Sequence, residues 1–88
     1  MWFRDEFLNY WWNNKKIYVT SHALDELDEE NEIMDTVCEV LDKGEHKVES
    51  KREGKHIANL KIGKTIFEVV YAISNSTCVI IHFGSKRL

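Results

Sequence analysis

The chain between residues 56 and 83 constrains the fold more than any other part, because two short turns divide it into three strands. Gly63-Lys64 is a two-residue connection with glycine first, which is typical of a type II′ hairpin turn. Ser74-Asn75-Ser76 reads as a three-residue turn. Together the turns predict an antiparallel meander in which Glu68 lies opposite Asn59 on one side and opposite His82 on the other.

The two turns also predict which side chains share a face of this meander. Side chains alternate between the faces of a sheet, so a slip of one residue would exchange the faces. One predicted face is almost wholly apolar and forms the core: Ala58, Leu60, Ile62, Phe67, Val69, Tyr71, Ile73, Val79, Ile81 and Phe83. The other face is mixed: Ile57, Asn59, Lys61, Ile66, Glu68, Val70, Ala72, Cys78, Ile80 and His82.

The N-terminal segment is rich in aromatic residues. Apolar side chains recur there at helical spacing, which predicts an amphipathic helix over residues 2–14. Its tryptophans either cap the core of a small domain or anchor a contact with a partner or a second copy, because aromatic side chains commonly anchor interfaces. These tryptophans are Trp2, Trp11 and Trp12.

The middle of the chain predicts a strand followed by two acidic helices. Residues 16–20 form a short β-rich run, and Ser21 is a suitable N-cap for a helix through residues 22–30. A second helix over residues 32–43 ends at Gly44, a residue type that commonly stops helices. The predicted buried stripes are Ala23, Leu24, Leu27, Ile33, Val37, Cys38, Val40 and Leu41.

A polar run at residues 46–52 completes the sheet. Its lysines suit an edge strand, and Gly54 turns the chain back into the meander. The predicted fold class is therefore α+β, an antiparallel sheet of about four meander strands and a short first strand, with helices packed on one face. The 88 residues form a single domain that ends in a short basic tail at residues 84–88.

Composition narrows the class of protein. No apolar run is long enough to span a membrane and the N-terminus lacks the order of a signal peptide, so we expect a cytoplasmic protein without membrane contact. Cys38 and Cys78 are expected as free thiols. Residues 22–45 hold ten acidic groups against Lys43, whereas residues 46–88 hold eight basic groups against three acidic ones. The basic part could meet nucleic acid or be a solvated surface.

A polar row crosses the mixed face of the predicted sheet. Asn59, Glu68 and His82 lie on neighbouring strands, with Cβ atoms about 5 Å apart. A carboxylate beside a histidine orients the imidazole, so the row is a candidate catalytic site with an acid/base pair. Positive charge for a substrate phosphate is available nearby from Lys61, Lys86 and Arg87. The alternative is an ordinary cross-strand ion pair on a solvated sheet.

An apolar strip is predicted beside this row and consists of Ile57, Val70 and Ile80. A strip of this kind is seldom left bare in water. It therefore either packs under the N-terminal helix, forms a homodimer contact or receives a partner.

No metal site and no cofactor are expected. Cys78 and His82 have a spacing that resembles a ligand pair, but four residues of a strand span about 13 Å, which is too far for one ion. Cys38 belongs to a helix stripe, where it is more simply a core residue.

Three stretches of the chain resemble a known family. They are Val19-Thr20-Ser21-His22-Ala23-Leu24, the helix end VCEVLDKGE and the central strand FEVVYAI. Their order, over about residues 17–83, resembles a family of small prokaryotic domains of unknown function related to the BrnT and RelE toxins. The resemblance implies a RelE-like fold, whose ribonuclease members act on RNA with the exposed sheet face and C-terminal basic residues. His22 matches the histidine that typically opens the first helix in that family, where helix-start packing and capping are its simplest roles.

Two functions follow from these features. The first is a RelE/BrnT-like toxin, or a toxin-derived protein, that acts on RNA as a metal-independent endoribonuclease with His82 and Glu68 as its acid/base pair. Such a toxin implies an antitoxin partner. The second is a non-catalytic interaction module or homodimer that uses the tryptophan-rich helix or the apolar strip.

Overall fold

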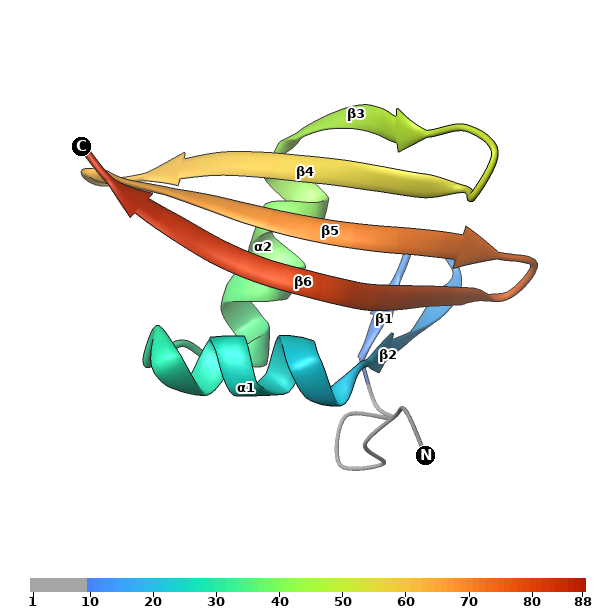
Figure 1. The fold of residues 1–88 in the computed structure, drawn as a ribbon, viewed down its shortest axis with the longest axis horizontal. Coiled ribbons are helices and arrows are strands. Elements are labelled where there is room, and N and C mark those ends of the chain that lie inside the picture. Colours follow the sequence, from blue (N-terminus) through green and yellow to red (C-terminus); the bar gives the residue numbers. More distant parts are fainter. Residues whose placement is uncertain (1–9) are drawn as a thin grey trace.

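The computed structural model describes residues 10–88, which fold into one sheet and two short helices (Figure 1). In chain order the elements are β1 (Trp11–Trp12), β2 (Lys15–Val19), α1 (Ser21–Glu29), α2 (Met34–Lys43), β3 (Glu45–Ser50), β4 (Lys55–Ile62), β5 (Thr65–Ser74) and β6 (Thr77–Arg87). The fold is α+β, as the sequence predicts.

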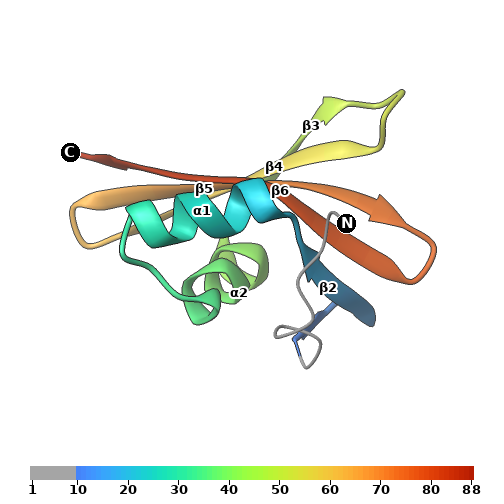
Figure 2. The ribbon, with the colours of Figure 1, turned by 60° about the horizontal axis from the view of Figure 1, so that its bottom comes forward.

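The strands of the described chain form one mixed sheet of order β1-β2-β6-β5-β4-β3. Strands β3 to β6 are the predicted antiparallel meander, with β3 at its edge. Strand β2 adds to the far side of β6 and runs parallel to it, whereas the prediction was a purely antiparallel sheet. Both helices lie on one side of the sheet, so its other face is not covered by α1 or α2 (Figure 2).

The prediction of an N-terminal helix is wrong for the part of it that the structure describes. Trp11 and Trp12 form strand β1, which pairs with β2 across a turn at Asn13 and Asn14. Both asparagines have positive φ, 55° and 63°, and asparagine tolerates this left-handed conformation better than most residues. The two residues therefore act as a hairpin turn where a helix end was expected. Trp2 and the rest of the predicted helix lie outside the described residues.

The hairpin of β4 and β5 has the predicted register. Leu60 pairs with Phe67, and Asn59 pairs with Glu68. Gly63 has a φ of +64°, the conformation that the first position of a type II′ turn requires. The turn residues thus specify this pairing locally, without help from the rest of the fold.

The hairpin of β5 and β6 departs from the prediction twice. Its turn is the two-residue Asn75-Ser76, so Ser74 pairs with Thr77. A bulge then shifts the register again, because Tyr71 pairs with Ile80 whereas Val70 pairs with His82. The two shifts add, so the partner of Glu68 is Gly84, and the prediction that Glu68 lies directly opposite His82 is wrong.

Each shift of one residue exchanges the two faces of β6, so beyond the bulge the two shifts together restore the predicted faces. His82 shares the open face with its partner Val70, and Phe83 is buried in the core, as predicted. Between turn and bulge the faces are exchanged, so Cys78 and Ile80 enter the core in place of Val79 and Ile81. Ile80 is therefore not part of an exposed apolar strip, and that prediction is wrong for this residue.

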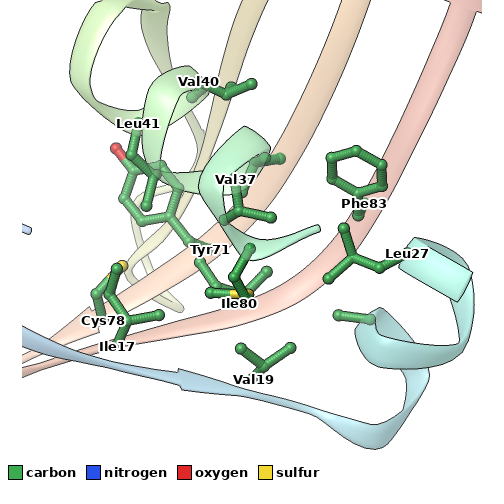
Figure 3. Packing of buried hydrophobic residues seen from close by; sticks show 14 of the residues in the cluster. Ile17, Val19, Leu27, Val37, Val40, Leu41, Tyr71, Cys78, Ile80 and Phe83 are labelled. Atoms are coloured by element: carbon green, nitrogen blue, oxygen red, sulfur yellow. The ribbon is translucent and has the colours of Figure 1, made fainter. Parts of the chain in front are cut away.

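The core lies between the helices and the sheet (Figure 3). Met34, rather than Ile33, is the first buried residue of α2, because Ile33 has an extended backbone at the helix start and is 63% exposed. Each buried aliphatic side chain contributes about 1.5–3 kcal/mol, so this cluster is the main source of stability. Its best buried members include Ile17, Val19, Leu27, Val37, Val40, Leu41, Tyr71, Cys78, Ile80 and Phe83.

The helix ends have identifiable causes. Thr20, one residue before the predicted cap, accepts the N–H of Ala23 at 3.2 Å and starts α1. Asn31 has a φ of 59° and ends the helical path. Gly44 ends α2 as predicted but with an extended backbone. Its lack of a side chain is required instead by close contacts, since a Cβ would lie 2.4 Å from the Val40 carbonyl oxygen and 2.6 Å from that of Asn59.

The C-terminal residues extend the sheet. Strand β6 continues to Arg87, so most of the segment expected as a basic tail is a strand paired with β5. Of the two helices in residues 10–88, neither has the length and apolar character that a membrane crossing requires.

Candidate functional site

The candidate site lies where β6 loses β2 as its neighbour. The parallel pairing of β2 with β6 ends at Val19 and Ile80, and α1 begins immediately afterwards. The N–H of Thr20 donates to the Ile80 carbonyl at 3.1 Å, and its hydroxyl donates to the Ile81 carbonyl at 3.4 Å. Helix α1 then runs beside the remainder of β6 (Figure 1). Side chains of α1 therefore meet the edge of β6 beyond the bulge.

Glu26 is the α1 residue that joins the two elements most closely. Its Oε1 accepts the N–H of Phe83 at 3.0 Å, and its Oε2 lies 2.7 Å from Nδ1 of His82. A backbone N–H at a strand edge needs a partner, and the carboxylate supplies it. The Glu26 side chain is only 16% exposed, which holds both contacts in a partly desolvated place.

His22 lies one helical turn before Glu26 and on the same side of α1. Its Nε2 is 3.4 Å from Glu26 Oε1, and its ring stacks on that of His82 with centroids 5.9 Å apart and planes inclined by 21°. One potential ligand atom from each of the three residues lies within 4.8 Å of the other two. Two imidazoles and a carboxylate thus converge at the contact between α1 and β6.

A pocket of about 340 Å³ opens beside His82 on the uncovered face of the sheet. It contains the three residues of the predicted catalytic row, although their pairing differs from the prediction. It also contains one of the predicted phosphate-binding lysines. The lining residues are Asn59, Ile66, Glu68, His82, Gly84, Ser85 and Lys86.

The geometry within the pocket depends on Gly84. Glu68 pairs with Asn59 and with Gly84, so His82 is its diagonal neighbour, with a separation of about 7–8 Å between the two positions. Because Gly84 has no side chain, space remains between Glu68 and the imidazole. A Cβ on Gly84 would lie 3.6 Å from Nε2 of His82. The nitrogen that does not contact Glu26 therefore lies at the pocket.

The contact with Glu26 decides what His82 can do chemically. A carboxylate oxygen accepts hydrogen bonds, so a proton on Nδ1 points to Glu26, and the ring orientation is fixed. Nε2 is then the nitrogen available to exchange a proton with a bound molecule. The side chain is 42% exposed, which leaves it accessible from the pocket. This is the arrangement of a general acid/base with an orienting carboxylate.

The three predicted phosphate-binding residues fall on different faces. Lys61 and Lys86 both pair with Ile66, so they flank it in one row of the open face. Lys61 also lines a neighbouring pocket of about 380 Å³ that shares Asn59 and Ile66 with the first. Arg87 pairs with Thr65, one position further along β6, and alternation puts it on the opposite face. The structure thus brings two of the three together.

Sequence reasoning missed two members of the site, His22 as a polar contact and Glu26 altogether. Their i, i+4 spacing on a helix is a local signal that they share a side of α1. Nothing local links Glu26 to His82, because that contact depends on the parallel pairing of β2 with β6.

The predicted interface residues have separate environments. Ile57 and Val70 are cross-strand partners on the open face, without Ile80. Trp12 packs against the core, stacking on His46 with centroids 5.3 Å apart and meeting the edge of Tyr71. Trp11 is 60% exposed on the edge strand, with Lys16 Nζ 6.0 Å from its ring centroid. The capping role therefore fits Trp12, whereas Trp11 is free to meet a partner.

The two cysteines are free thiols, as predicted, with Cys78 buried and Cys38 half-buried. Burial raises the pKa of the Cys78 thiol from its ordinary 9.0 to about 12, and burial also raises the pKa of Cys38. A nucleophilic or metal-binding cysteine requires a thiolate. Neither cysteine is therefore suited to chemistry at neutral pH.

Comparison of the chain with protein-family models, with curated proteins and with solved structures gave no match in any of the three.

Proposed function

We propose that the protein is a RelE/BrnT-like toxin, or a toxin-derived protein, that cleaves RNA as an endoribonuclease at the open face of its sheet. The observation that carries the proposal is the placement of His82, whose Nδ1 is held by Glu26 at 2.7 Å while Nε2 lies at a pocket. The same pocket contains a carboxylate, an amide and a lysine. The imidazole and the carboxylate can transfer protons at a phosphodiester, and the amide and the lysine can bind its oxygens.

In the proposed reaction Glu68 accepts the proton of a ribose 2′-hydroxyl. The 2′ oxygen forms a bond to the adjacent phosphorus and the bond from phosphorus to the 5′ oxygen breaks. His82, as an imidazolium oriented by Glu26, gives its Nε2 proton to the departing oxygen. The products are a 2′,3′-cyclic phosphate and a 5′-hydroxyl, and the two proton transfers need no metal ion.

Charge on the open face supports an RNA substrate. Lys61 and Lys86 flank Ile66 beside the pocket, where they can balance the phosphate charge that grows in the transition state. Asn59 lines both pockets and offers hydrogen-bond donors to a phosphate oxygen. Helices α1 and α2 lie on the other side of the sheet (Figure 2), and Glu26 of α1 and its C-cap residue Glu30 reach His82 and Ser85 at the margin of the pocket.

The sequence resemblance also supports the proposal. The RelE-like fold that it implies binds RNA on an exposed sheet face. The helices here leave one face of the meander uncovered, and the pocket with His82 is on that face. The proposed reaction acts on RNA and not on DNA, because only RNA supplies the 2′-hydroxyl nucleophile.

Inducible expression in bacterial cells tests this function. Wild-type protein is expected to arrest growth and to degrade cellular RNA, and His82→Ala is expected to relieve the arrest at equal protein level. His56→Ala is the matched control, because His56 stacks on Tyr71 away from the pocket and should leave toxicity unchanged. Equal toxicity of wild type and His82→Ala, or absence of RNA cleavage in both, would contradict the proposal.

A second candidate function is non-catalytic protein binding, with an antitoxin, another protein or a second copy of the chain. Exposure of Trp11 on the short edge strand β1 favours it, because a large aromatic side chain at a sheet edge is a common interface anchor. Light scattering after size exclusion separates the cases. A dimer that Trp11→Ala converts to a monomer would support this function. A protein that is monomeric at every concentration and binds no candidate partner would argue against it.

A further inference from the structure

We propose that His22, Glu26 and His82 form a binding site for a divalent transition-metal ion, with Zn²⁺ as the defining probe. Two of these residues come from α1 and the third from β6, so the site exists only in the folded chain. Within residues 10–88 this is the group of three histidine, cysteine or carboxylate side chains whose ligand atoms converge. Binding of the ion does not depend on the proposed ribonuclease activity.

The distances fit one small ion. Four-coordinate zinc with bonds of about 2.0–2.1 Å keeps neighbouring ligand atoms about 3.3 Å apart. His22 Nε2 is 3.4 Å from Glu26 Oε1, and His82 Nδ1 is 2.7 Å from Glu26 Oε2. The full set of three ligand atoms lies within 4.8 Å. The three ligand atoms therefore converge to near the spacing that a single ion requires.

The ligand types select the class of ion. Imidazole nitrogens suit zinc, nickel, copper and cobalt, whereas magnesium and calcium prefer oxygen ligands throughout. Two histidines and one glutamate are an established donor set for zinc sites that keep a further position for water or substrate. The carboxylate also supplies negative charge, which offsets part of the charge of the ion.

The residues around the ligands help to hold them close together. The N–H of Phe83 donates to Glu26 Oε1 and fixes the carboxylate, and hydrogen bonds of this kind orient metal ligands. The i, i+4 spacing places His22 and Glu26 on one side of α1. His22 is 69% exposed, which gives an ion a path from solvent. Glu26, the least exposed ligand, is thus the most firmly held, and His22, the most exposed, can close over the ion.

Metal binding would also affect the proposed reaction, and this consequence rests on the proposed function. Nδ1 is the nitrogen of His82 that faces Glu26, so a metal ion bound there would replace the contact by which Glu26 orients the imidazole toward the pocket. We therefore expect Zn²⁺ to inhibit RNA cleavage at the concentrations at which it occupies the site.

Calorimetric titration with zinc chloride, without RNA, tests the site directly. The wild-type protein should bind one Zn²⁺ per chain, and His22→Ala, Glu26→Gln and His82→Ala should each weaken binding by more than about 100-fold, because loss of an outer-shell partner alone costs 10–100-fold. His56→Ala and Cys38→Ser are matched controls that should bind as wild type does. Circular dichroism checks that every variant is folded.

Two of the substitutions are mild enough to keep the test decisive. His22 is mostly exposed, and Gln at position 26 retains an oxygen that can accept from Phe83. A visible spectrum of the Co²⁺ complex should show a site with nitrogen and oxygen ligands, without the charge-transfer band of a thiolate. Absence of Zn²⁺ binding by folded wild type, or an affinity of His22→Ala and His82→Ala equal to that of wild type, would overturn the metal site. Failure of RNA cleavage together with normal Zn²⁺ binding would overturn only the proposed function.

Discussion

Glu26 uses its two oxygens on two successive residues of β6, and this double contact positions the candidate acid/base group. One oxygen accepts from the Phe83 backbone and the other holds Nδ1 of His82. The orientation of His82 thus depends on a residue 56 positions earlier in the chain. Glu26 therefore both stabilises the contact between α1 and β6 and orients the histidine of the pocket.

Removal of the Glu26 carboxylate is expected to destabilise the fold. Glu26→Ala leaves the Phe83 N–H without its partner, and such a loss costs about 1–3 kcal/mol. Glu26→Gln should lose less, because its amide oxygen can still accept. Urea unfolding measures both, with Glu29→Ala as an exposed control on the same helix. Equal stability of Glu26→Ala and the control would show that this contact contributes nothing.

The buried Cys78 thiol predicts a loss of stability at alkaline pH. Its pKa is about 12 in the folded chain, raised by burial from an ordinary 9.0. Above pH 9 the unfolded chain therefore releases this proton while the folded chain keeps it. The free energy of unfolding falls as pH rises from 9 to 12, by at most about 1.4 kcal/mol per pH unit for one proton.

Unfolding in urea between pH 8 and pH 10.5 checks this prediction. Cys78→Ala is expected to be less stable than wild type at pH 8 because it leaves a cavity, yet to lose less stability as pH rises. Burial raises the pKa of Tyr71 and Cys38 as well, so some alkaline loss remains in the variant. Parallel pH profiles for the two proteins would contradict the role of Cys78.

At the scale of elements, the hairpin of β4 and β5 was predictable and that of β5 and β6 was only partly so. Gly63 specifies its turn by its own backbone preference, and the pairing follows from it. The bulge at Ile81 has no comparable local signal. It coincides with the end of β2 and with the hydrogen bond from Thr20 to the Ile81 carbonyl. The register of β6 is therefore set by tertiary contacts that the sequence of the hairpin does not contain.

The junction of α2 and β3 should tolerate no side chain at Gly44. A methyl group there would lie 2.4 Å from the Val40 carbonyl oxygen, and backbone atoms on both sides leave it no room. We expect Gly44→Ala to lower the free energy of unfolding by about 3 kcal/mol, at the upper end of overpacking effects. Gly63→Ala is the comparison, because its φ of +64° costs about 1 kcal/mol but no atom lies near. Smaller destabilisation by Gly44→Ala than by Gly63→Ala in thermal or urea unfolding would contradict this packing.

At the scale of the whole molecule, the sheet separates an acidic helical side from an open face with lysines. The sequence predicted an α+β fold, an uncovered sheet face and the presence on it of Asn59, Glu68 and His82. It did not predict that Glu26 reaches His82, because no short-range pattern records that α1 lies against β6. The acidic residues of α1 looked like a solvated surface, and most of them are; Glu26 differs only through its place in the fold.

Lys86 and Arg87 are neighbours in the chain but lie on different faces of the sheet, so their removal should affect RNA binding differently. Lys86 is on the open face beside the pocket, and Arg87 alternates to the other face. Lys86→Ala should weaken binding of a single-stranded RNA and reduce the slope of log affinity against log salt by about 0.7, the loss of one phosphate contact. Arg87→Ala should change the slope less. Fluorescence anisotropy over a series of salt concentrations measures both, and a larger effect of Arg87→Ala would place RNA on the wrong face.

Cleavage of a defined RNA by the purified, folded protein tests the central claim most directly. The wild type and His56→Ala are expected to cleave a fluorogenic single-stranded RNA to products with 2′,3′-cyclic phosphate ends, in buffer containing a metal chelator. His82→Ala should lower the rate by at least about 100-fold, the usual contribution of a general acid or base, and Glu26→Gln should lower it less. No cleavage by folded wild type, or equal rates for wild type and His82→Ala, would contradict the assignment of His82 as the catalytic acid/base.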